Sequence, residues 1–100
     1  MDDKERKHLA MLMAEKLPVL RKETGLSQQA LAALAGISRS TITKIEGKSQ
    51  TMTWNTYLSL LFIFSKNEQT KDLIKFFGIY PDEVDEYLSE KLEKEVDYEK

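Results

Sequence analysis

The sequence predicts an all-α fold, and three observations lead to this prediction. Apolar residues recur at helical spacing along several segments, and no segment shows the sustained apolar–polar alternation of a half-buried strand. Only two prolines and four glycines interrupt the 100 residues. Serine or threonine stands just before several of the apolar segments, where it can cap a helix. A chain of this length can bury one hydrophobic core but not two.

The first helix is expected from about Asp3 to Lys16. Pro18 should break or kink it, because proline lacks a backbone donor and disfavours helix at the residue before it. A short helical continuation should then end at Gly25, which can adopt the left-handed conformation of a C-terminal cap.

Two short helices are expected next. Ser27 can cap a helix over residues 28–35, which Gly36 should end. Ser38 can cap a second helix that runs to about Glu46, and residues 47–51 form a polar loop.

Thr53 can cap a fourth helix that should form the buried centre of the fold. Its apolar residues follow helical spacing on one side and continue on the other, with Trp54, Tyr57, Leu58, Leu61 and Phe62 on the first side and Leu60, Ile63 and Phe64 on the second. A buried strand over residues 57–64 is the alternative, since short apolar runs are ambiguous.

A fifth helix, capped by Ser65 or Asn67, should extend to Gly78. A sixth helix should begin at Pro81, since proline and the acidic residues after it favour a helix start. Its apolar stripe consists of Val84, Tyr87, Leu88, Leu92 and Val96. Either the body of the same chain or a second copy should cover this stripe.

Composition and charge exclude several classes of protein. There is no cysteine, which excludes disulfides, thiol nucleophiles and zinc knuckles. The start of the chain is charged, without a signal-like apolar segment, and the longest apolar run is too short to span a membrane. We therefore expect a cytoplasmic protein with no membrane association. The two parts of the chain differ in charge: residues 1–81 carry 12 basic and 8 acidic side chains, whereas residues 82–100 carry 3 basic and 9 acidic side chains. The chain is therefore expected to have a basic body and an acidic tail.

Residues 28–47 have the pattern of a helix-turn-helix motif. Ala32 is small enough for two helices to cross closely, and Gly36 permits a turn with positive φ. An apolar face consists of Leu31, Ala35, Ile37, Ile42 and Ile45, and the opposite face of the second helix is short and polar. Such a helix can enter a DNA major groove.

These residues resemble the Xre family, the helix-turn-helix domains of phage lambda-type repressors and Cro. The resemblance covers about residues 17–61 and includes Leu20-Arg21, Gly25-Leu26-Ser27-Gln28, Leu31-Ala32, Gly36-Ile37-Ser38-Arg39-Ser40-Thr41-Ile42 and Ile45-Glu46. It implies a lambda-repressor-like five-helix DNA-binding domain over residues 1–80. Residues 81–100 would then form an additional acidic amphipathic helix, a candidate dimerisation element.

The resemblance also implies roles for individual residues. The residues that would contact DNA bases are Ser38, Arg39, Ser40, Thr43 and Lys44. The residues that would contact DNA phosphates are Gln28, Thr41 and Lys48. Arg21 and Glu46 match an internal ion pair. Arginine is suited to this reading role because its guanidinium can donate to both O6 and N7 of guanine.

Two positions depart from the family pattern and affect the loop after the second motif helix. The family commonly has one residue between the glutamate and the glycine of this turn, whereas Glu46 and Gly47 are adjacent here. Met52 replaces the proline that is common before the fourth helix.

We therefore expect a transcriptional regulator, a repressor, that binds a short inverted repeat of double-stranded DNA as a homodimer. One alternative is an antitoxin or another protein-interaction module with a helix-turn-helix fold, and a second is a DNA-binding module that acts with an effector-sensing partner. No cofactor, metal site or enzymatic activity is expected, since His8 is the only histidine and there is no phosphate loop or nucleophile elbow.

Overall fold

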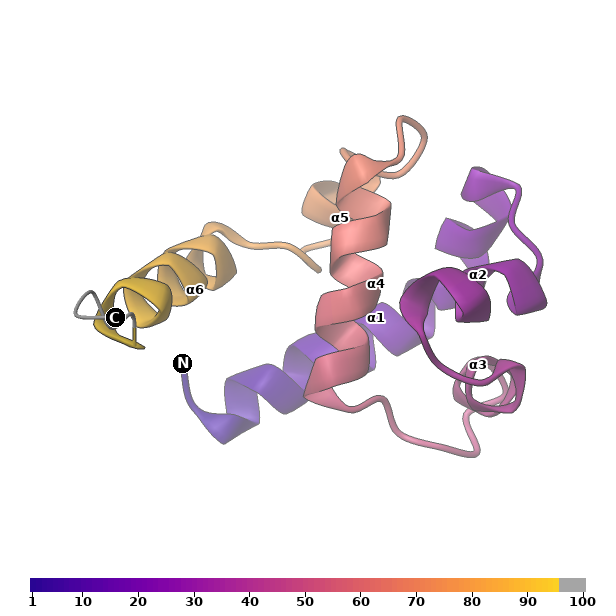
Figure 1. The fold of residues 1–100 in the computed structure, drawn as a ribbon, viewed down its shortest axis with the longest axis horizontal. Helices are drawn as coiled ribbons and strands as arrows, with labels where there is room; N and C mark the ends of the chain where they lie inside the picture. The colour runs from indigo at the N-terminus through magenta and orange to yellow at the C-terminus, as the bar shows by residue number, and fades with distance from the viewer. Residues whose placement is uncertain (96–100) are drawn as a thin grey trace, which may run out of the picture.

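The structure is a computed structural model, and it describes residues 1–95. Secondary structure within this range is entirely helical (Figure 1), which confirms the all-α prediction. The alternative of a strand over residues 57–64 is wrong. The helices are α1 (Asp3–Thr24), α2 (Gln28–Ala35), α3 (Arg39–Glu46), α4 (Trp54–Lys66), α5 (Leu73–Phe76) and α6 (Asp82–Glu95).

Helix α1 runs through Pro18 without interruption, so the predicted break is wrong. The sequence rule considers only the local loss of one hydrogen bond. In the folded chain Leu17 and Leu20, on either side of the proline, are completely buried and hold both parts of the helix against the core. The end of α1 is as predicted: Gly25 has φ 77° and its amide donates to the carbonyl of Lys22.

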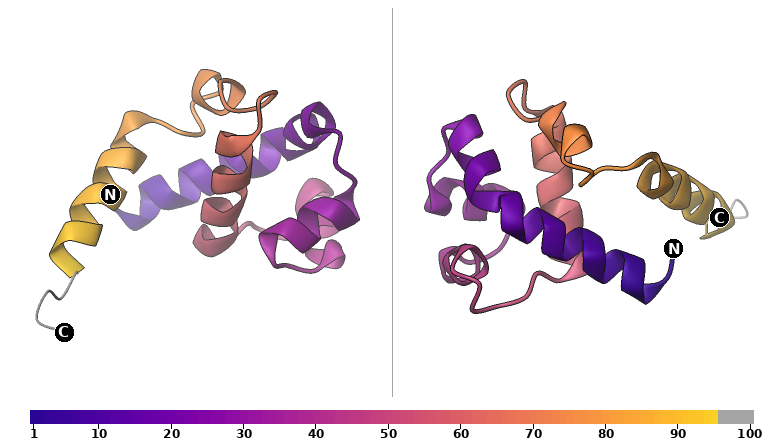
Figure 2. Two further views of the ribbon diagram at one scale, coloured as in Figure 1. Left: turned by 45° about the horizontal axis from the view of Figure 1, so that its top comes forward. Right: turned by 180° about the vertical axis from the view of Figure 1, so that it is seen from behind.

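Helix α4 crosses α1 near the middle of the molecule (Figures 1 and 2), and α2 and α5 also pack against it. Tyr57 and Phe64 of α4 are completely buried, as expected for a central helix. Phe62 is 66% exposed, however, so its predicted place in the buried stripe is wrong. The buried apolar residues are Leu9, Ala10, Met13, Leu17, Leu20, Leu31, Ala32, Ile42, Ile45, Met52, Tyr57, Leu60, Leu61, Phe64, Ile74, Ile79 and Val84.

The fifth helix is much shorter than predicted. It covers only Leu73–Phe76, and neither Ser65 nor Asn67 caps it. Asn67 instead accepts from the amide of Gln69 at 2.8 Å, which forms a tight turn directly after α4. Gly78 ends the segment as expected, with φ 76°.

Helix α6 divides the predicted apolar stripe into two parts. Val84 is completely buried against the body, and the hydroxyl of Tyr87 accepts from Arg6 of α1 at 3.0 Å. Leu88 and Leu92 are exposed, and Val96 lies outside the described residues. Figure 1 shows α6 and α3 at opposite ends of the long axis, which measures 43 Å. No helix within residues 1–95 is long and apolar enough to cross a bilayer.

Candidate nucleic-acid interface

Helices α2 and α3 form the two arms of the motif. Gly36 lies between them with φ 71°, and the amides of Gly36 and Ile37 donate to the carbonyls of Ala33 and Ala32. These two bonds are a Schellman motif, which ends α2 and turns the chain into α3. Ala32 is buried, and α2 packs against α3.

A serine begins each of the two helices. The Ser27 hydroxyl accepts from the amide of Ala30 at 3.0 Å, and the Ser38 hydroxyl accepts from the amide of Thr41 at the same distance. Each bond satisfies one of the amides that a helix start leaves without an intrahelical partner. Ser38 also lies 2.8 Å from the Thr41 hydroxyl, so these two predicted DNA contacts bond to each other in this structure.

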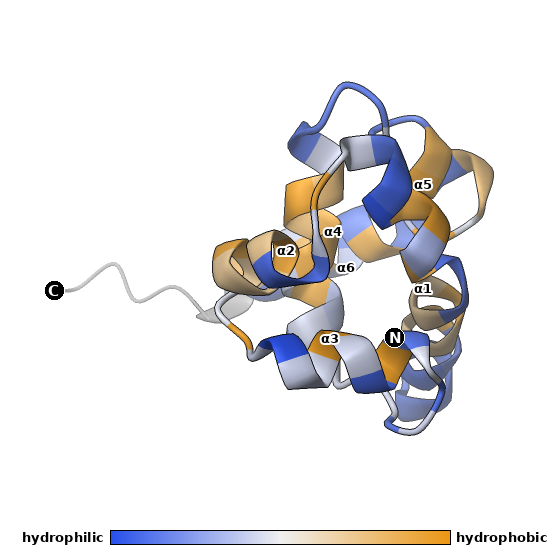
Figure 3. Cartoon of the chain, turned by 90° about the vertical axis from the view of Figure 1, so that its right-hand side faces the viewer, coloured by the Kyte–Doolittle hydropathy of each residue, from blue (hydrophilic) through white to orange (hydrophobic). Residues whose placement is uncertain are grey.

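The exposed face of α3 carries the other predicted reading residues. Ile42 and Ile45 bury the inner face, while Arg39, Ser40, Thr43 and Lys44 are all exposed on the outer one. Figure 3 looks onto this end of the molecule, where α3 lies beside α2 and carries both hydrophilic and hydrophobic residues. Within residues 1–95 neither Arg39 nor Lys44 has an ion-pair partner. The structure therefore brings two free cations and two short hydroxyl side chains onto one helix face.

Arg21 and Glu46 form an ion pair that joins α1 to the end of α3. The Arg21 Nε lies 2.8 Å from Glu46 Oε2, and a second guanidinium nitrogen donates to Oε1 at 3.2 Å. Their side chains are 20% and 9% exposed. A third guanidinium bond reaches the carbonyl of Leu26 and holds the α1–α2 loop. The ion pair therefore fixes the position of α3 relative to α1.

The pKa of the Glu46 carboxyl reflects two opposing causes. Desolvation by burial raises it, but the hydrogen bonds from Arg21 and Gln28 and the Arg21 charge outweigh burial, so the pKa lies below its ordinary value. The pKa of Arg21 is raised, mainly by its hydrogen bond to Glu46. Both groups are therefore charged at neutral pH.

Gln28 extends this network to the outer face of α3. Its Nε2 donates to Glu46 at 2.9 Å, and its Oε1 accepts from the Thr43 hydroxyl, also at 2.9 Å. The sequence predicted Gln28 as a phosphate contact and Thr43 as a base reader. It did not predict that the two side chains would bond to each other across the seam between α2 and α3.

The turn after α3 shows how the chain accommodates Glu46 and Gly47 without a residue between them. Gly47 has an ordinary φ of −81°, and Lys48 has φ 62°, the only positive φ of a non-glycine residue within residues 1–95. The amides of Lys48 and Ser49 donate to the carbonyls of Ile45 and Lys44, which is again a Schellman motif. Lys48 thus occupies the left-handed position that favours glycine, and its side chain is exposed near the end of α3.

A cluster at the other end of the molecule was not predicted from the sequence. The guanidinium of Arg6 lies over the rings of Trp54 and Tyr87, at 6.0 and 5.7 Å from their centres. Its Nε is buried without a hydrogen-bond partner. Arg6 had no distinguishing sequence signal among the charged residues of the first helix.

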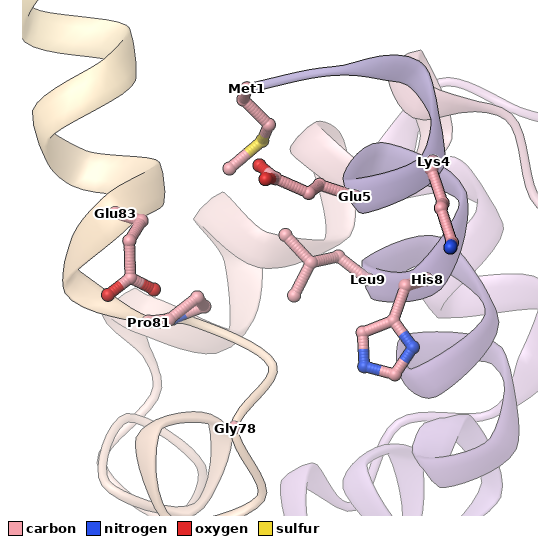
Figure 4. Close-up of a pocket in the computed structure, with 8 residues that line it drawn as sticks. All are labelled: Met1, Lys4, Glu5, His8, Leu9, Gly78, Pro81 and Glu83. Carbon is pink, nitrogen blue, oxygen red and sulfur yellow. The ribbon is translucent and has the colours of Figure 1, made fainter.

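A groove of about 610 Å³ lies between the start of α1 and residues 78–83 (Figure 4). Glu5 and Glu83 lie on its opposite walls, and Leu9 contributes to its apolar lining. None of the predicted DNA-contacting residues lines this groove. Within residues 1–95 there is also no cluster of three or more potential metal-ligating side chains.

Comparison with known proteins places the motif in a family. Residues 12–63, just over half of the chain, match a family described as a helix-turn-helix domain. The chain belongs to this helix-turn-helix family. The matched region begins within α1 and ends within α4, so it includes the ion pair, the Gln28 network and the exposed face of α3. Searches among curated proteins and among solved structures gave no significant match.

Membership of this family supports DNA binding, because helix-turn-helix domains place their second helix in the major groove of DNA. The second helix of the motif is α3, which carries the exposed polar face described above.

Proposed function

We propose that the protein is a sequence-specific transcriptional regulator of the Xre type that inserts α3 into the major groove of double-stranded DNA. The observation that carries the proposal is the outer face of α3, where Arg39, Ser40, Thr43 and Lys44 are exposed together. The N-terminal residues of a recognition helix approach base edges, and Arg39 is the first residue of α3. Lys44 follows five residues later and reaches a neighbouring base or phosphate.

Phosphate contacts surround this face in the proposal. Gln28 begins α2 beside α3 and retains one amide hydrogen outside its bond to Glu46, and that hydrogen can donate to a phosphate. Thr41 lies among the reading residues, between Ser40 and Thr43, and Lys48 follows them along the chain. The acidic helix α6 lies at the far end of the molecule, where its charges do not oppose the DNA.

A randomised-site selection followed by binding measurements on the selected duplex tests this function. Arg39→Ala should weaken binding to the selected site by about 1–3 kcal/mol and relax the preference at one base pair. Lys91→Ala is the matched control, because it removes a cation from α6 at the opposite end and should leave affinity unchanged. An Arg39→Ala protein with the original site preference and affinity would show that α3 does not read DNA through this face.

We further propose that the protein acts as a repressor and binds a short inverted repeat as a homodimer. Two recognition helices separated by one duplex turn, about 34 Å, match the symmetry of such a site. Leu88 and Leu92 on α6 are left exposed by the body of the chain and provide the apolar contact for a second copy. Footprinting the DNA upstream of the protein's own gene tests the repressor assignment.

The combined substitution Leu88→Lys and Leu92→Lys tests the homodimer. It should convert a dimer into a monomer in sedimentation experiments without unfolding the chain, because Leu88 is 37% and Leu92 67% exposed, whereas Val84, which anchors α6 to the body, is unchanged. A variant that still sediments as a dimer would move the interface elsewhere, with Phe76, which is 82% exposed, as the next candidate.

A protein partner is the second candidate function, and the same exposed apolar residues favour it. An antitoxin or an effector-dependent module needs a surface for another protein that leaves the DNA-binding face free, and α6 satisfies this condition. A protein that stays monomeric alone but binds the product of a neighbouring gene through Leu88 and Leu92 would support this alternative over the homodimer.

A further inference from the structure

The Glu46 carboxylate determines the orientation of the Gln28 amide. Glu46 is paired with Arg21 at 2.8 Å and its pKa is lowered, so it is ionised and offers only lone pairs. The Gln28 atom 2.9 Å from it must therefore be the nitrogen Nε2, which donates. Exchanging the oxygen and nitrogen of this amide would place two acceptors in contact, so the amide has one orientation.

The fixed amide in turn determines the direction of the Thr43 hydroxyl. With Nε2 directed at Glu46, the Gln28 oxygen Oε1 faces the Thr43 Oγ1 at 2.9 Å. An amide oxygen cannot donate, so the single hydroxyl hydrogen of Thr43 points at Gln28. The exposed side of Thr43 then presents oxygen lone pairs and a methyl group, but no hydrogen-bond donor.

We propose that Thr43 reads DNA only as a hydrogen-bond acceptor and therefore selects adenine or cytosine on the strand it faces. The inference rests on the proposed function, because it presumes that α3 lies in the major groove. Adenine and cytosine present exocyclic amino donors there, whereas guanine and thymine present the acceptors O6 and O4. Gln28 is the positioning residue, since it acts on the base through Thr43.

This preference concerns the orientation of a base pair, which distinguishes it from a preference for A·T-rich or G·C-rich DNA. Every base pair has one amino donor in the major groove, on adenine or on cytosine. Thr43 should therefore accept A·T and C·G pairs in one orientation and disfavour the same pairs reversed, without distinguishing A·T from G·C content.

Ser40 provides an internal comparison on the same helix. Its side chain is exposed, and within residues 1–95 its hydroxyl has no hydrogen-bond partner, so it can rotate to donate or accept. Arg39 and Lys44 are donors only. Thr43 is thus the reading residue whose hydroxyl polarity is fixed by the fold.

The test is a randomised-site selection with the full chain and three variants, Thr43→Val, Thr43→Ser and Gln28→Met. The position that Thr43 reads is the one whose preference differs between wild type and Thr43→Val. Wild type should prefer adenine or cytosine there, and Thr43→Val should lose roughly threefold to tenfold in affinity for the preferred site. Thr43→Ser keeps the locked hydroxyl and should keep the preference.

Gln28→Met is the decisive variant, because it leaves the Thr43 hydroxyl in place but removes the group that orients it. Methionine fills a similar volume, and Glu46 retains its bonds to Arg21. The Thr43 position should then accept guanine and thymine as well, while the Ser40 position is unchanged. Far-UV circular dichroism and thermal melts check that each variant is folded. If Gln28→Met does not fold, the two Thr43 variants still test the proposal.

Two kinds of failure are distinguishable. If wild type enriches no sequence, the proposed DNA-reading function is wrong. If it enriches a site but prefers guanine or thymine at the Thr43 position, or if Thr43→Val has the wild-type preference at every position, the acceptor assignment alone is overturned. A folded Gln28→Met protein with an unchanged adenine-or-cytosine preference would also overturn it.

Discussion

The ion pair between Arg21 and Glu46 should contribute measurably to stability, although many ion pairs do not. At about 4 Å and an effective dielectric constant of about 20, two unit charges attract by about 4 kcal/mol. Desolvation offsets part of this attraction. Removing one partner of a completely buried pair costs about 3–5 kcal/mol because the other charge is left unpaired. Since the Arg21 and Glu46 side chains are 20% and 9% exposed and the pair is not completely buried, we expect a cost just below that range, about 2–3 kcal/mol for Arg21→Met.

A double-mutant cycle with Arg21→Met and Glu46→Gln measures the coupling in urea unfolding at neutral pH. The midpoint should fall for each single variant, with an unchanged m-value, and the coupling energy should be about 1.5–3 kcal/mol. The exposed pair Lys7–Asp3 is the control, with side chains 76% and 79% exposed, and should show no measurable coupling.

The pair should also add a pH-dependent component to stability. The folded-state pKa of Glu46 is lowered, so its stabilisation is complete above the ordinary value of 4.5 and is lost as the pH falls through the lowered pKa. The stability difference between wild type and Glu46→Gln should therefore narrow on acidification. A coupling of zero, or a difference that does not depend on pH, would refute the conclusion that this pair fixes α3 to α1.

Three further predictions concern stability. Tyr57→Phe should cost about 1–3 kcal/mol in urea unfolding because it leaves a buried carbonyl unpaired, whereas Tyr80→Phe, whose hydroxyl bond is exposed, should cost little; equal costs would contradict this reasoning. Lys48→Gly should be more stable than Lys48→Ala by about 1 kcal/mol, because glycine adopts the positive φ at this position without strain. Both variants should weaken DNA binding equally, since both remove the charge. Val84→Ala should lower stability by about 1.5–3 kcal/mol while Leu92→Ala leaves it nearly unchanged, and the reverse order would mean that α6 docks through its distal half.

The local signals in the sequence predicted the helix ends well. Ser27, Ser38 and Thr53 each accept from the amide three residues later, and Gly36 has positive φ, as expected. Such features depend on a few consecutive residues, which the sequence displays directly. The end of α3 at Glu46 was also expected, but not that Lys48 would take the left-handed conformation after it, since the sequence has its glycine one position earlier.

The errors arose where distant contacts or competing local bonds decide the structure. Pro18 looked like a break, but burial of its neighbours keeps α1 continuous. Asn67 looked like a cap for a following helix, yet its single carboxamide oxygen is used by the turn that ends α4. The exposure of Phe62 depends on which helices surround α4, and helical spacing alone cannot supply this.

For the candidate site, the sequence predicted which residues share a face but not how their side chains bond. The resemblance to a known family implied the Arg21–Glu46 contact, and the structure contains it. The bonds from Gln28 to Glu46 and Thr43 depend on the rotation of flexible side chains across two helices. That rotation is determined by the folded arrangement, which neither spacing nor composition encodes.

The separation of the two ends of the molecule makes one more prediction about the proposed dimer. Arg39 lies on α3 and Leu92 on α6, at opposite ends of a long axis of 43 Å, so substitutions there should not affect each other within one chain. A dimer on an inverted repeat loses the Arg39 contact twice, so Arg39→Ala should cost about twice the binding free energy that it costs on a single half-site. In a Leu92→Lys background the ratio of these two costs should fall to about one, because each chain then binds alone. A ratio near one in the otherwise wild-type protein would show that the two recognition helices do not bind as a pair.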